Sequence, residues 1–213
     1  MIKLDILSDP VCPWCYIGKS YLDRALEKNA SHPFEIEWHP FMLNPEMPAE
    51  GMNRNDYLKA KFGDHQNIAD MLMTLKEHAE KAGVELNIED QTHQPNTMDA
   101  HRLIHWAGLE QKQTPLVSAI FKAHWVESRR IDDINVLIDL SEKTGLDGAL
   151  IERLLKGDAD KDLILDRFSH SQKMGVQSVP TFIVANQHVV PGAQPVEMWD
   201  KVISELNEQS EKS

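Results

Sequence analysis

The sequence predicts an α/β fold in which the two ends of the chain form one sheet and a helical block lies between them. The first part of the chain is patterned as strand, helix and strand, the middle as helices almost throughout, and the last part as strand, strand and helix. Helices that cover a sheet in layers bury the apolar faces of such a set of elements.

The N-terminal elements form a strand–helix–strand unit. Residues 3–8 form the first expected strand, and a helix is expected over residues 13–28. Residues 34–38 alternate between apolar and polar side chains, which is typical of a strand. This order predicts a parallel pair of strands joined by a right-handed crossover.

The middle of the chain, from about Asn53 to Met174, is patterned as a series of helices that end at glycines in several places. The expected helices span residues 55–62, 65–82, 97–111, 115–128, 133–144, 148–156 and 161–173.

The C-terminal part predicts a hairpin followed by a helix. Residues 181–185 are a continuous β-prone run, Asn186 and Gln187 are the expected turn, and residues 188–190 return as the second strand. Residues 195–207 form a final amphipathic helix. Four tryptophans fall at strand or helix spacing and are predicted to lie in the core: Trp38, Trp106, Trp125 and Trp199.

Composition excludes several classes of partner. The 213 residues carry a net charge of −12. Nucleic acids and anionic membrane surfaces attract basic patches, so we expect neither as a partner. We expect no signal peptide, because Asp5 and Asp9 interrupt the N-terminal apolar run, and no transmembrane helix. The chain has two cysteines and thus no spare pair for structural disulfides, so the expected location is the cytoplasm.

Both cysteines lie in Cys12-Pro13-Trp14-Cys15, between the first strand and the first helix. Thiol–disulfide chemistry uses this spacing at a strand–helix junction. Free backbone N–H groups and the helix dipole favour a thiolate there, so we expect the pKa of Cys12 to fall from about 8.5 into the range of roughly 3.5–7.5. The sequence therefore predicts Cys12 as an exposed nucleophile and Cys15 as the shielded thiol that resolves the mixed disulfide.

Two other interpretations of the cysteines are a zinc half-site and two unrelated thiols. Zinc prefers four ligands, and the sequence holds no second cysteine pair. His101 and His105 lie four residues apart on an expected helix, but no carboxylate or cysteine at suitable spacing completes a metal site with them. We therefore predict no metal and no bound cofactor, with glutathione as a candidate co-substrate.

Four stretches of the sequence resemble one family of proteins. They are residues 8–18 (Ser-Asp-Pro-Val-Cys-Pro-Trp-Cys-Tyr-Ile-Gly), residues 96–97 with 100–102, residues 175–182 and residues 192–195. With these stretches the chain resembles the DsbA superfamily. Within it, the chain looks most like the cytosolic FrnE-type branch, which is related to the 2-hydroxychromene-2-carboxylate isomerases.

The resemblance implies a thioredoxin-like fold with a large all-helical insertion. Residues 1–43 and 176–213 would form the thioredoxin-like domain, and residues 44–175 the helical insertion. The resemblance also implies that Cys12 is the nucleophile, that Cys15 is its partner, and that the bond between Val179 and Pro180 is cis.

The resemblance further implies how substrate is held. The backbone of Val179, before Pro180, would pair with an extended substrate as an added strand does. Asn96 and His101 would lie near the cleft. Trp14 contacts substrate in one interpretation and packs against the helical insertion in the other.

The sequence departs from the family pattern at two positions. DsbA carries histidine where this chain has Trp14, so the strongly oxidising character of DsbA is not carried over. The isomerases carry serine at the position of Cys12 and bind glutathione, so two cysteines here favour disulfide exchange.

Three functions follow as hypotheses. The preferred one is a cytoplasmic protein disulfide oxidoreductase that acts on thiol- or disulfide-containing proteins and peptides. The second is a glutathione-dependent isomerase or transferase of small aromatic substrates. The third is a peptide-binding chaperone.

Overall fold

The structure is a computed structural model that describes residues 1–63 and 65–211. Its main sheet has four strands in the order β2-β1-β5-β6, with β1 (Ile2–Ser8), β2 (Phe34–Pro40), β5 (Thr181–Val184) and β6 (His188–Pro191). Strands β1 and β2 are parallel, and β5 is antiparallel to both β1 and β6. The two ends of the chain therefore complete one sheet, as predicted.

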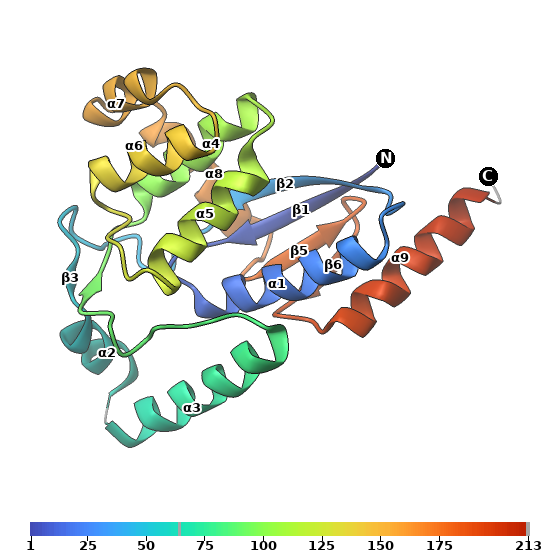
Figure 1. Cartoon of the computed structure of the whole chain (residues 1–213), viewed down its shortest axis with the longest axis horizontal. Helices are drawn as coiled ribbons and strands as arrows, with labels where there is room; N and C mark the ends of the chain where they lie inside the picture. Colours follow the sequence, from blue (N-terminus) through green and yellow to red (C-terminus); the bar gives the residue numbers. More distant parts are fainter. Residues whose placement is uncertain (64, 212–213) are drawn as a thin grey trace.

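Helices occupy most of the chain between β2 and β5. They are α2 (Arg54–Phe62), α3 (His65–Ala82), α4 (Met98–Leu109), α5 (Gln113–Trp125), α6 (Ile134–Lys143), α7 (Gly148–Lys156) and α8 (Lys161–Lys173). Figure 1 shows α4 to α8 gathered at the β2 side of the sheet, where α4, α5 and α8 pack against that strand. The predicted α/β fold with a helical insertion is confirmed.

Alternation along the strands gives the sheet two different faces. Helices α1 (Pro13–Lys28) and α9 (Val196–Glu211) pack together on one of them (Figure 1). There the ring of Phe182 lies 4.8 Å from that of Trp199, edge to face. Asp5, Leu7 and Ile183 point to the opposite face, toward α8. All four tryptophans predicted as core residues are buried.

The structure differs from the prediction in two local features. The turn between β5 and β6 is centred on Ala185 and Asn186, one residue earlier than predicted, because both adopt positive φ and so form the tight hairpin turn that suits twisted strands. A second, two-stranded sheet joins β3 (Met52–Asn53) to β4 (His93–Gln94). Strands of two residues are too short to show alternation in the sequence.

The predicted division into residues 1–43 with 176–213 and residues 44–175 stays a prediction. Asp64 and residues 212–213, which fall within these segments, lie outside the described part of the chain. Among the helices that are described, none is long and apolar enough to cross a membrane.

Candidate active site

Cys12 and Cys15 lie at the junction between β1 and α1. Cys12 is the N-cap of α1 in an extended conformation, and Pro13 occupies the first helical position, where its missing N–H costs nothing. The carbonyl of Cys12 accepts hydrogen bonds from the N–H groups of Cys15 and Tyr16, at 3.1 and 3.3 Å. This turn brings the two cysteines 3.4 Å apart, and both are free thiols.

The prediction that Cys12 is exposed is wrong. The residue is 4% exposed, and Cys15 is 1% exposed. The cover comes from a loop 167 residues later in the chain, where the carbonyl of Val179 accepts a hydrogen bond from Cys12 Sγ at 3.5 Å. The sulfur is therefore shielded by the backbone that the resemblance assigns to substrate binding.

Burial and the neighbouring Cys12 change the pKa of the second thiol, Cys15. Burial raises the pKa of Cys15 well above its ordinary value, and the neighbouring Cys12 raises it further, through a hydrogen bond and through charge. The Ser8 hydroxyl and the backbone of Asp9 act in the opposite direction, because hydrogen bonds favour the thiolate. Cys15 consequently keeps its proton more firmly than a thiol in water.

The loop over Cys12 is held by close packing on α1. The peptide bond between Val179 and Pro180 is cis. The carbonyl of Pro180 accepts a hydrogen bond from the N–H of Gly192 at 2.8 Å. A side chain at Gly18 would place its Cβ 3.1 Å from Pro180 Cγ and 3.3 Å from Ala193 Cα, so this glycine permits the approach.

The other two residues predicted to contact substrate are engaged elsewhere. Trp14 is half-buried, and its ring lies edge-on to His78 of α3, 4.9 Å away. The Asn96 amide donates to the carbonyl of Met47 at 2.7 Å, and its oxygen accepts from the N–H of Met98 at 2.8 Å. Substrate contact by Trp14 and Asn96 stays a prediction.

Buried polar groups lie beside the cysteines, and the sequence analysis assigned no role to Asp9 among them. Asp9 is fully buried, and its Oδ2 accepts from the N–H of Leu43 at 2.7 Å. His101 Nε2 lies 3.7 Å from Asp9 Oδ1. The indole N–H of Trp125 donates to the carbonyl of Pro10 at 3.0 Å. For Asp9, the one signal in the sequence is its place, with Pro10, between an apolar strand and the cysteines.

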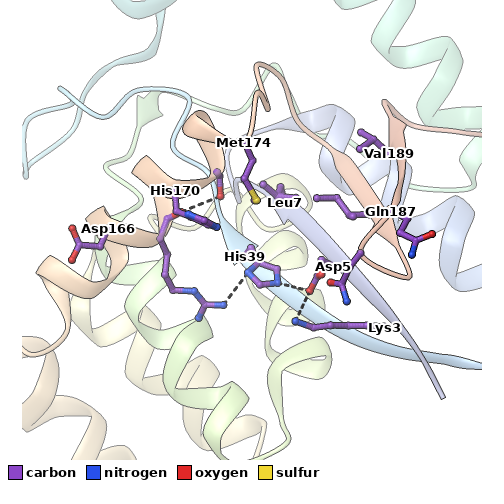
Figure 2. A pocket seen from close by; sticks show the side chains of 13 residues that line it. Lys3, Asp5, Leu7, His39, Asp166, His170, Met174, Gln187 and Val189 are labelled. Atoms are coloured by element: carbon purple, nitrogen blue, oxygen red, sulfur yellow. Dashed lines mark hydrogen bonds and ion pairs between the residues drawn. The ribbon is translucent and has the colours of Figure 1, made fainter.

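A cavity of about 630 Å³ lies between the sheet and α8 (Figure 2). Asp5 and His39 line it, and together with the neighbouring Glu37 they are close enough to hold a cation. Lys3 already pairs with both carboxylates, at 3.1 and 3.0 Å, and Arg167 pairs with Glu37 at 2.7 Å. These two cations neutralise the cluster, and the absence of a metal stays a prediction.

The structure has two thiols on the first turn of the helix that follows β1, and a C-terminal hairpin completes its sheet. Together these features define a thioredoxin-like protein. A family model for the DSBA-like thioredoxin domain matches residues 3–204, so the chain belongs to that family. This confirms the resemblance to the DsbA superfamily and the thioredoxin-like fold with a helical insertion.

Individual relatives agree with this assignment. The uncharacterized protein YwbO of Bacillus subtilis is 30% identical over 205 residues, which cover 96% of either chain. The crystal structure of a probable DsbA oxidoreductase from Streptomyces coelicolor is 27% identical, with a TM-score of 0.85 over 96% of this chain and 89% of that one.

A more distant structure shares the fold. The cytosolic disulfide reductase DsbM from Pseudomonas aeruginosa, solved with GSH, is 19% identical, with a TM-score of 0.69 over 97% of this chain and 99% of that one.

Proposed function

We propose that this protein exchanges disulfides with protein or peptide substrates through Cys12 and Cys15. One observation carries the proposal: the two free thiols lie 3.4 Å apart on the first turn of α1, with Cys12 at its N-cap. The distance is short enough for a disulfide to form with little movement of the backbone. The helix N-terminus stabilises a negative charge on the first sulfur.

The chemistry proceeds in two steps. The Cys12 thiolate attacks a substrate disulfide, forms a mixed disulfide and releases one substrate thiolate. Cys15 then loses its proton and attacks Cys12 Sγ, so that the Cys12–Cys15 bond forms and the second substrate thiolate leaves. The reverse sequence oxidises a substrate dithiol, and the relative reduction potentials decide the direction.

The backbone of Val179 is the proposed contact for the substrate chain. Its carbonyl accepts a hydrogen bond from the Cys12 thiol. A substrate N–H that donates to this carbonyl instead would release the sulfur for attack. Main-chain pairing of this kind accepts varied sequences, as strand addition does. Cis Pro180 continues this loop, and we assign both residues to substrate binding.

The redox partner of the cysteine pair has to be a thiol or a disulfide. Glutathione is a thiol of suitable size, and the DsbM structure that shares this fold was solved with GSH. We propose that glutathione is the co-substrate and that no cofactor is bound. We also propose that the protein belongs to the FrnE-type branch and is cytoplasmic. The chain has no cysteines beyond the pair, as suits a compartment where structural disulfides are rare.

The experiment is the reduction of insulin by dithiothreitol, followed as turbidity. We expect the wild type to accelerate the reaction and the double variant Cys12→Ser, Cys15→Ser to give the rate of dithiothreitol alone. A wild type no faster than dithiothreitol would overturn the proposal. A peptide-binding chaperone would instead suppress aggregation, and the double variant would keep that effect.

A further inference from the structure

We propose that His101, paired with Asp9, receives the proton that Cys15 must lose in the second step. The inference rests on the proposed function and concerns the less accessible of the two thiols. Cys15 is 1% exposed, so bulk water has little access to its proton. Burial also raises the pKa of this thiol. A group inside the protein has to accept it.

The Ser8 hydroxyl is the polar group that acts on this thiol. Ser8 lies at the C-terminal end of β1 and is buried, and its hydroxyl lowers the pKa of Cys15. Among the described residues Ser8 Oγ has no fixed hydrogen-bond partner, so the hydroxyl is free to turn toward the sulfur. A hydroxyl both donates and accepts, so Ser8 can pass a proton onward.

A small cavity of about 10 Å³ lies beside Ser8 and His101. Both residues line it, and the volume is about what one water molecule needs. His101 is 3% exposed, and within the described chain its Nε2 has no hydrogen-bond partner. The cavity therefore has two polar atoms free to hold a bridging water, which completes a path from Cys15 to the imidazole.

Asp9 is the acidic partner of His101. Its side chain is fully buried, and Oδ1 lies 3.7 Å from Nε2 of the imidazole. The N–H groups of Val11 and Leu43 donate to its two oxygens and fix its position. Asp9 and His101 act on Cys15 through Ser8, and so both are positioning residues.

Two other titratable groups face this region. Cys12 lies on the same turn as Cys15, and His39 lines the cavity from β2. The ring of His39 is already engaged, because Nε2 contacts Asp5 at 2.6 Å and Nδ1 contacts Arg167 at 2.9 Å. His101 therefore offers the free imidazole nitrogen on this side of the thiol.

The proton balance of the step is complete. The Cys15 proton moves through Ser8 and the water to His101, and Cys15 Sγ attacks Cys12 Sγ in the mixed disulfide. The Cys12–Cys15 bond forms while the bond to the substrate sulfur breaks, and the electron pair leaves on the substrate thiolate. His101 returns its proton to Cys15 when a substrate thiolate reopens the disulfide.

The test is a rapid-mixing reaction of the reduced protein with an aromatic disulfide that releases a coloured thiolate. Attack by Cys12 releases the first equivalent, and resolution by Cys15 releases the second. We expect His101→Gln to leave the first phase within about twofold and to slow the second by about 10²-fold, a typical size for general acid–base catalysis. The pH dependence of the second phase should also change, whereas that of the first phase should not.

Two further variants complete the design. Ser8→Ala removes a single hydroxyl and should slow the second phase in the same way. His105→Gln, one turn later on α4, should change neither phase. A His101→Gln protein with the wild-type rate and pH profile in the second phase overturns the inference. A wild type that lacks the first phase contradicts the proposed function instead.

Discussion

A Cys15→Ser variant will stop after the first step and accumulate as a mixed disulfide with its substrate, whereas Cys12→Ser will form no adduct. The difference follows from the positions of the two thiols. Cys12 is the N-cap of α1 and contacts the carbonyl of Val179, whereas Cys15 is the more deeply buried thiol. Turnover should fall by about three orders of magnitude or more in both variants, as it does when residues that act as a unit are removed singly.

Mass spectrometry under non-reducing conditions after mixing with a peptide disulfide makes the comparison. The two serine variants control for each other, since each replaces one buried sulfur by oxygen within the same turn. An adduct on Cys15 in the Cys12→Ser variant would reverse the assigned roles. Tight binding of glutathione, with full turnover of a hydroxychromene-type substrate by Cys15→Ser, would favour the glutathione-dependent isomerase, which does not need the second thiol.

Replacing Arg102 by Met is expected to destabilise the fold strongly. The side chain is 0% exposed and reaches from α4 to the last turn of α7 and the segment that follows it. It donates to the Asp99 carboxylate at 2.7 Å and to the carbonyls of residues 154, 155, 157 and 159 at 2.6–3.4 Å. Hydrogen bonds to a charged group contribute about 1.5–3 kcal/mol each, so the free energy of unfolding should fall by at least about 3 kcal/mol.

Urea denaturation followed by tryptophan fluorescence measures this loss. Arg129→Met is a matched control, because Arg129 also pairs with carboxylates, Glu127 and Asp139, but its side chain is 27% exposed. Exposed pairs contribute at most about 1 kcal/mol. Equal losses in the two variants would show that the buried network around Arg102 does not stabilise the fold as inferred.

Local patterns in the sequence predict most of the fold. The start of α1 is set by Pro13 at the first helical position, and residues 34–38 alternate as β2 does. The hairpin was predicted one residue late, because Ala185 is not a residue type that signals positive φ. Such errors are small, since hydrophobic periodicity identifies an element more reliably than its ends.

The environment of the site was harder to predict than its residues. Cys12 and Cys15 are recognised from their spacing, but the burial of Cys12 depends on Val179, far along the chain. Arg102 and Asp9 carry charges, which are usually exposed, and their burial depends on partners from other elements. No local pattern contains contacts of this kind.

Equilibration in glutathione redox buffers, with acid quenching, alkylation and mass analysis, tests the central claim most directly. The account predicts that the two thiols oxidise together, in one reversible two-electron transition, to a Cys12–Cys15 disulfide. Two thiols that stay reduced at every ratio, or that carry glutathione without ever bonding to each other, would contradict it.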